Sequence, residues 1–153
     1  MKNLVLIFVI ASFISLHACA QNAKNLPIKV KTAFNQKFPG AQKVKWGKEN
    51  ATEWEAEFTL NNKGYSANFN TDGNWLESEY KIGEKEIPTA VTATLGKQFP
   101  GYKIAESEIS ETAKGKVYEF AIKTGKTKTE VAVNPDGTLV KKEAMKEKGE
   151  GKD

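Results

Sequence analysis

The sequence predicts an α+β protein of two tandem repeats, each with one helix packed on a four-stranded antiparallel meander sheet. Three observations predict this fold. Residues 26–40 (LPIKVKTAFNQKFPG) return as residues 87–101 (IPTAVTATLGKQFPG). After each copy of this segment, the spacing of apolar residues changes from about four positions to two. Each copy then has an Asn-x-Asp-Gly turn, at residues 70–73 and 134–137.

The segment that opens each copy is expected to be a helix of about 12 residues. Pro27 and Pro88 stand at its start, where a missing N–H costs no helical hydrogen bond. A Pro-Gly pair ends each helix, because proline restricts the residue before it and glycine permits the turn. Apolar residues recur every four positions and form one buried stripe: Val30, Phe34 and Phe38, then Val91, Leu95 and Phe99.

Alternating apolar and polar residues then predict half-buried strands. The helix of each copy is expected to cover one face of its own sheet and to leave the other face open. The expected strands lie near residues 43–46, 53–60, 65–70 and 75–82 in the first copy, and near 103–109, 118–122, 131–133 and 138–145 in the second.

These expected elements divide the chain into four segments. They are an export signal (residues 1–20), a first unit (26–82), a second unit (87–145) and a charged, glycine-bearing tail (146–153) that is expected to be disordered. We expect the two units to pack together or to share a rigid junction, because units of this size are marginally stable alone.

The export signal has an apolar run of about 13 residues, too short to span a bilayer. It ends at Ala18-Cys19-Ala20, which fits an A-x-A cleavage site. The alternative is a lipoprotein signal, since residues 16–19 resemble a lipobox in which Cys19 would be lipidated, although His17 fits that motif poorly. We therefore expect an exported protein, periplasmic or secreted, and attached to a membrane only if Cys19 carries a lipid.

The composition excludes several function classes. The 23 basic residues are all lysine and face 19 acids, so neither a strong positive charge nor arginine is available to bind nucleic acid. The single cysteine and single histidine both lie at residues 17–19, so the remaining chain has no thiolate or imidazole. No cofactor and no metal site are expected. With no convergent pair of acids either, the sequence predicts a protein that is not an enzyme.

An export signal, two helices ending in Phe-Pro-Gly, strands with alternating aromatics and Asn-x-Asp-Gly hairpins together resemble the PepSY-like group of exported bacterial proteins, also described as beta-lactamase-inhibitor-like. The resemblance covers residues 26–145, and its most specific marks are residues 38–40, residues 99–101 and the two Asp-Gly turns. In the secreted beta-lactamase inhibitor, two helix-plus-sheet units form a concave surface that clamps a partner protein. The resemblance implies binding of a protein, without catalysis. Unlike that inhibitor, this chain has no disulfide.

Tryptophan and tyrosine are the candidate binding residues, because they bury a large area at protein interfaces for little entropy. Aligning the two copies places Glu106 opposite Trp46 and Lys116 opposite Trp54, so the repeated framework does not require tryptophan at these positions. The alternative is that both tryptophans complete the core of the first unit or pack against the second. The candidates are Trp46, Trp54, Trp75 and Tyr80.

The predicted function is therefore that of an exported, non-enzymatic module that binds an envelope or secreted protein or peptide, as an inhibitor or adaptor. The alternative is an envelope protein with a structural or small-ligand-carrier role. The acids Glu53, Glu55 and Glu57 alternate along one strand and are expected to form a solvated sheet face.

Overall fold

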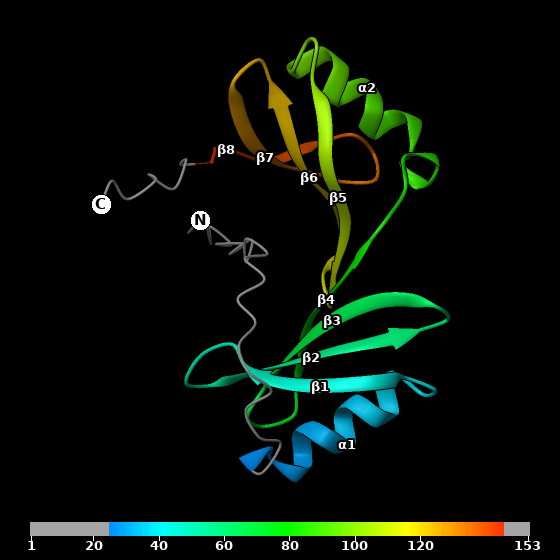
Figure 1. The fold of residues 1–153 in the computed structure, drawn as a ribbon, viewed down its shortest axis with the longest axis vertical. Helices are drawn as coiled ribbons and strands as arrows, with labels where there is room; N and C mark the ends of the chain where they lie inside the picture. Colours follow the sequence, from blue (N-terminus) through cyan, green and yellow to red (C-terminus); the bar gives the residue numbers. More distant parts are fainter. Residues whose placement is uncertain (1–24, 146–153) are drawn as a thin grey trace, which may run out of the picture.

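The computed structural model describes residues 25–145 (Figure 1). The predicted export signal, Cys19 and the charged tail at residues 146–153 lie outside the described residues. Within residues 25–145, no helix has the length and apolar character needed to cross a bilayer.

The described chain runs from a helix through four strands, a short 3-10 turn, a second helix and four more strands. The helices are α1 (Ile28–Lys37) and α2 (Thr89–Gln98), and the 3-10 turn is η2 (Glu84–Glu86). The strands are β1 (Gln42–Lys48), β2 (Glu53–Leu60), β3 (Lys63–Asn70), β4 (Trp75–Lys81), β5 (Lys103–Thr112), β6 (Gly115–Thr124), β7 (Thr127–Val133) and β8 (Leu139–Ala144).

All eight strands belong to one antiparallel sheet in the order β1-β2-β3-β4-β5-β6-β7-β8. The prediction of two tandem repeats, each with its own four-stranded sheet, is therefore wrong. Strand β4 pairs with β5 from Glu77↔Thr112 to Lys81↔Glu108, so the meander continues through the middle of the molecule. Alternation in a sequence predicts which face a side chain takes, but it does not say whether the last strand of one set pairs with the first strand of the next.

Strand β5 provides the residues for this central pairing. It ends at Thr112, beyond its predicted end at residue 109, and residues 110–112 pair with residues 77–79 of β4. Figure 1 shows the consequence: β4 and β5 form the narrow middle of the molecule, with α1 below the lower part of the sheet and α2 beside the upper part.

The predicted positions of both helices are confirmed. The stripe residues Val30, Phe34, Val91 and Leu95 are buried. Each helix ends as expected at a Phe-Pro-Gly segment, where the backbone N–H of Phe38 or Phe99 donates to the carbonyl of the residue four positions earlier. The glycines that follow, Gly40 and Gly101, have positive φ, which reverses the chain toward the sheet.

The two Asn-x-Asp-Gly turns contact the helices, and this contact explains their glycines. Gly73 has φ +86°, and a Cβ at this position would lie 2.7 Å from the carbonyl oxygen of Lys29 in the first turn of α1. Gly137 has φ +89°, and its Cβ would lie 2.8 Å from the carbonyl oxygen of Ala90 in α2. Glycine is needed here both for the backbone conformation and for the close approach of turn and helix.

One face of the sheet, which we call the helix-covered face, carries the two clusters of the apolar core. The cluster under α1 is rich in aromatic residues: Val30, Phe34, Trp54, Ala56, Phe58, Ala67 and Phe69. The cluster under α2 is mainly aliphatic: Ile82, Ile87, Val91, Leu95, Phe99, Ile109, Tyr118, Phe120, Ile122, Val131 and Val133.

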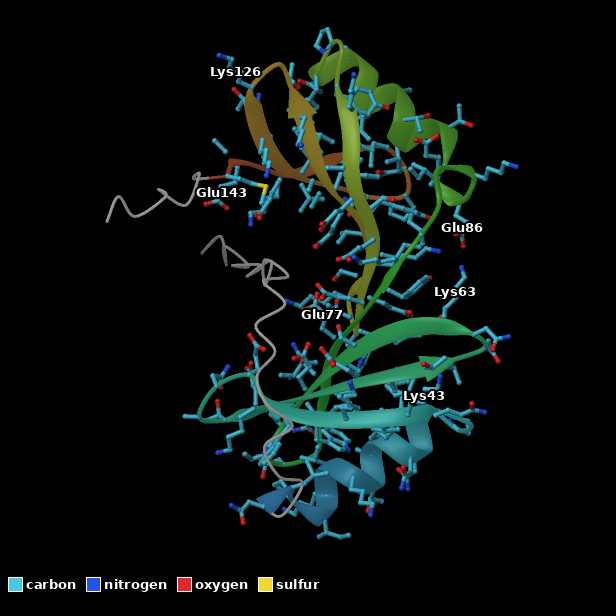
Figure 2. All side chains as sticks on the ribbon, viewed as in Figure 1. Lys43, Lys63, Glu77, Glu86, Lys126 and Glu143 are labelled. Atoms are coloured by element: carbon cyan, nitrogen blue, oxygen red, sulfur yellow. The ribbon has the colours of Figure 1, made fainter. Side chains whose placement is uncertain are left out.

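Contacts on this side also join the two clusters. Tyr65 packs against the first cluster and Tyr80 against the second, and their ring centroids are 4.8 Å apart. Nearby, the Nζ of Lys63 donates to the Oε1 of Glu86 over 2.5 Å, and Figure 2 shows these two side chains pointing toward one another across the narrow middle. The tyrosine pair thus joins β3 to β4, and the ion pair joins β3 to η2.

Candidate binding face

The other face of the sheet, the helix-free face, carries mostly polar side chains. Its residues follow from strand alternation and pairing, since Glu55 lies opposite Asn68, which in turn lies opposite Glu77. Neither helix covers this face in the described part of the chain (Figure 1). Its acids are Glu53, Glu55 and Glu57 on β2, Glu77 and Glu79 on β4, Glu106 and Glu108 on β5, Glu119 on β6, Glu130 on β7 and Glu143 on β8.

Five of these acids cross the middle of the sheet, and we call them the acidic band: Glu55, Glu77, Glu79, Glu108 and Glu119. Glu77 and Glu79 are neighbours on one face of β4, and Glu108 lies directly opposite Glu119 across β5 and β6. With strands about 4.8 Å apart, the four spacings from β2 to β6 make the band about 19 Å long. Figure 2 shows Glu77 at the narrow middle of the molecule.

Residues in and beside the band are shielded from solvent, and we call this low-accessibility part of the face the recess. Glu119 is only 6% exposed, and Ser110, beside Glu79 on β5, is 1% exposed. Ala132, opposite Glu119 on β7, is 2% exposed. Small residues on a flat, uncovered sheet would be reached by water, so their burial indicates that the strands bend and that longer side chains surround them.

Several oxygen atoms in this recess have no donor. The Oε1 of Glu108 and the Oδ1 of Asn68 are buried and accept no hydrogen bond within the described residues. None of the hydrogen bonds or ion pairs among residues 25–145 involves the carboxylate of Glu119. The Oε1 of Glu77 does accept a hydrogen bond, from the hydroxyl of Ser110. Buried acceptors without donors cost free energy, so they are uncommon in folded proteins.

Burial raises the pKa of every acid in the band. Burial, together with the negative charges of Glu77, Glu119, Glu108 and Glu55, raises the pKa of Glu79 to about 8. Burial and repulsion from Glu77 and Glu108, opposed by Lys141, raise the pKa of Glu119 to about 7. Burial is also the first cause of the raised pKa of Glu55, Glu77 and Glu108. The recess is therefore poor in positive charge for the number of acids it holds.

The predicted binding residue Trp54 lies in the core. It is 4% exposed in the aromatic cluster, and its indole N–H has no acceptor within the described residues. The strand register also corrects the alignment of the two copies. Trp54 pairs with Phe69, directly before the first Asn-x-Asp-Gly turn, and Tyr118, not Lys116, pairs with Val133, directly before the second. The framework therefore has a buried aromatic side chain at this position in both parts of the sheet.

The other three predicted residues are half-buried and also lie on the helix-covered face. The ring of Trp46 packs edge-on against Phe34, with centroids 5.1 Å apart. The ring of Trp75 lies under the Nζ of Lys37, 3.4 Å from its centroid, and its indole N–H donates to Ser78 over 2.8 Å. The ring of Tyr80 packs at a tilt against that of Tyr65. A binding role for these residues stays a prediction, and the structure does not bring them onto the helix-free face.

Sequence reasoning identified Glu53, Glu55 and Glu57 as one sheet face but missed the band that continues across β4, β5 and β6. The usable signal was the alternation of acids in β4, where Glu77 and Glu79 follow the same pattern as β2. What the sequence could not supply was the pairing of β4 with β5, which places Glu108 and Glu119 beside them.

Neither a metal site nor an enclosed cavity is evident in the described part of the chain. No group of three or more His, Cys, Asp or Glu side chains there could hold a metal ion. The two best-formed hollows have volumes of about 170 and 320 Å³ and are open to solvent. The larger one is formed by residues 81–84 and 104–107 at the end of β4 and the start of β5.

A protein-family profile described as "Putative beta-lactamase-inhibitor-like, PepSY-like" matches residues 52–141 of the chain. The chain belongs to this PepSY-like family. The resemblance inferred from the sequence is thereby confirmed, and the matched region runs from β2 into β8 and includes every member of the acidic band. A search of curated proteins finds no match to this PepSY-like chain.

Solved structures share the fold. A BLIP-like protein from Bacteroides fragilis has a TM-score of 0.70 and 16% identity, over 81% of this chain and 89% of that chain. A DUF2874 family protein from Bacteroides uniformis has a TM-score of 0.71 and 18% identity, over 77% and 88%. A protein from Bacteroides eggerthii described as one of the "putative periplasmic proteins" has a TM-score of 0.70 and 16% identity, over 77% and 88%. At these identities the likeness concerns the fold alone.

Proposed function

We propose that this PepSY-like chain is an exported, non-enzymatic module that binds a protein or peptide partner on the helix-free face of its sheet. The observation that carries the proposal is the recess on that face, where the buried Glu119, four half-buried acids and two unpartnered oxygens lie across five neighbouring strands. A sheet face that served only to meet water would gain nothing from burying charged groups. Destabilising arrangements of this kind are expected where a surface has a function.

Three further facts support the proposal. The family is described as inhibitor-like, and one solved relative is called BLIP-like, so binding is the activity those names suggest. The first 20 residues have the pattern of an export signal, and another relative is called periplasmic. The described residues also present no enclosed apolar pocket of the kind that carriers of small ligands use, which favours binding over the carrier alternative. Inhibition of a particular target and a lipid on Cys19 remain hypotheses.

Site-directed photo-crosslinking in the native envelope tests the proposal. A photoreactive residue at Ala121, on the helix-free face of β6, is expected to crosslink to one partner protein. The same residue at Lys97, an exposed position in α2, is the matched control and is expected to give no such adduct. Adducts at Lys97 alone, or none at either position under conditions where the chain is exported, would contradict the proposal.

A further inference from the structure

The acidic band has a composition that selects for one kind of partner. The band consists of five carboxyl groups, and the Oδ1 of the adjacent Asn68 is a further buried acceptor without a donor among the described residues. The only hydroxyl donor of the described residues that reaches a carboxylate in the band is that of Ser110, on Glu77. A partner that completes these hydrogen bonds must bring donors, and a partner that relieves the mutual repulsion of the acids must bring positive charge.

Lysines of the protein itself approach the band only from its borders. Lys81, beside Glu108 on the same face, partly offsets the increase in the pKa of that acid. Lys141 on β8 does the same for Glu119. Lys141 also pairs with Glu130 at 3.7 Å and Glu143 at 3.0 Å, so its positive charge is shared among several acids. Nothing comparable lowers the pKa of Glu79, for which burial and four acids all act in the same direction.

The shape of the band favours an extended ligand. The acids lie along about 19 Å rather than around a point, and an extended chain rises about 3.3 Å per residue, so the band matches about six residues. A single metal ion does not fit this arrangement, since no three acids of the described residues converge on one position. Guanidinium or ammonium groups spaced along such a peptide would meet the acids of β2, β4, β5 and β6 in turn.

We propose that the helix-free face binds an extended, lysine- or arginine-rich segment of its partner protein, with Glu77, Glu79, Glu108 and Glu119 accepting hydrogen bonds from the cationic side chains. This inference rests on the function proposed above and specifies the chemistry of the partner. Buried acceptors give the second observation beyond the cluster itself. Glu119 is 6% exposed and accepts no hydrogen bond within the described residues, and the buried Oε1 of Glu108 also lacks a donor there.

Binding of such a segment depends on pH in a defined direction. A cation favours the charged form of each acid, so it must displace protons from Glu79 and Glu119, which are partly protonated near neutral pH. The charged groups that face them are Glu55 on β2, Glu77 and Lys81 on β4, Glu108 on β5, Glu130 on β7 and Lys141 on β8. Affinity is therefore expected to increase from pH 5.5 to pH 8.

The test uses fluorescein-labelled hexalysine as the probe and measures its anisotropy with the intact protein at low ionic strength. The double variant Glu79→Gln/Glu119→Gln is expected to weaken binding about tenfold or more, which is about 1.4 kcal/mol. The matched control Glu84→Gln/Glu111→Gln removes the same charge from exposed positions outside the band and is expected to change affinity less than about twofold. Circular dichroism of each variant verifies that it folds.

Three results would overturn the inference: no binding of hexalysine at low salt, equal weakening in the band and control variants, or binding that is weaker at pH 8 than at pH 5.5. Sedimentation of the protein alone tests whether a second copy of the chain occupies the helix-free face. Self-association that is lost in Glu79→Gln/Glu119→Gln would identify that second copy, and not a cationic segment, as the occupant. If crosslinks at Ala121 capture a partner while hexalysine fails to bind, the proposed function survives and only the cationic segment is excluded.

Discussion

On the helix-covered face, the strands place Trp54, Phe58 and Phe120 in close-packed clusters, whereas on the helix-free face the same strands place Glu55, Glu79 and Glu119 in a recess. The first face gains stability from each side chain that it buries. The second loses stability, because burial and mutual repulsion oppose ionisation of its acids. The difference teaches that aromatic side chains in this fold are explained by packing, while the acids call for a functional explanation.

The largest effect is expected from removing core aromatics. Phe58→Ala and Phe120→Ala each leave a cavity under a helix and should lower the free energy of unfolding by about 3 to 5 kcal/mol. Both residues are nearly fully buried, at 4% and 3% exposure. The neighbouring Glu57→Ala, exposed on the opposite face, is the control and should change stability by less than about 0.5 kcal/mol. Urea titrations that give losses below about 1 kcal/mol for both phenylalanines would reverse the assignment of the two faces.

Trp46 on β1 and Trp54 on β2 test whether aromatic residues of the helix-covered face serve packing. Trp54→Ala is expected to cost about 3 to 5 kcal/mol, because Trp54 is buried and corresponds to Tyr118 in the second half of the sheet. Trp46→Ala should cost roughly 1 to 2 kcal/mol, since its side chain is only half-buried. If chemical unfolding gives equally small decreases in the free energy of unfolding for both variants, the tryptophans would instead be explained by binding to a partner.

Two glycines allow the stability cost of an unfavourable backbone conformation to be distinguished from the cost of a steric clash with a helix. Gly40 and Gly73 share φ +86°, but only at Gly73 would a Cβ meet a helix carbonyl. Gly73→Ala is expected to cost about 2 to 3 kcal/mol and Gly40→Ala about 1 kcal/mol. Thermal or urea unfolding of both variants measures the difference, and equal losses would mean that the turn under α1 can move away without cost.

A stability change of the opposite sign, which depends on pH, is expected on the helix-free face. Because the folded pKa of Glu79 is raised from 4.5 to about 8, its favourable contribution is complete below pH 4.5 and is lost as the pH rises toward 8. Glu79→Gln should therefore match the parent protein near pH 4.5 and exceed its unfolding free energy by roughly 2 kcal/mol at pH 8. A gain that does not change with pH in urea titrations at the two values would show that this carboxyl ionises normally.

Much of the fold could be predicted from the sequence. The spacing of Phe34 and Phe38, the Pro-Gly pairs and the Asn-x-Asp-Gly turns located both helices and every described strand, because these are local properties of the chain. The pairing of β4 with β5 is not local. It depends on residues 110–112 at the end of β5. The strand register likewise moves the counterpart of Trp54 by two residues, from Lys116 to Tyr118.

The candidate site was harder to predict for the same reason. Alternation assigns Glu55 and Glu79 to a polar face, but it does not distinguish a solvated face from a recess. Burial of Glu119 at 6% depends on how the whole sheet bends and on neighbours from β5 and β7, which only the folded chain brings together. An export signal and family motifs predicted a binding protein, and they did not predict which face binds.

Methyl NMR with hexalysine tests most directly which face of the sheet binds. Val117 and Ala132 carry methyl groups on the helix-free face near Glu119, while Leu95 and Val131 carry methyl groups in the core under α2. We predict that the probe shifts the Val117 and Ala132 signals and leaves those of Leu95 and Val131 nearly unchanged. Shifts confined to the α2 core, or to helix residues, would contradict the assignment of the acidic recess as the binding face.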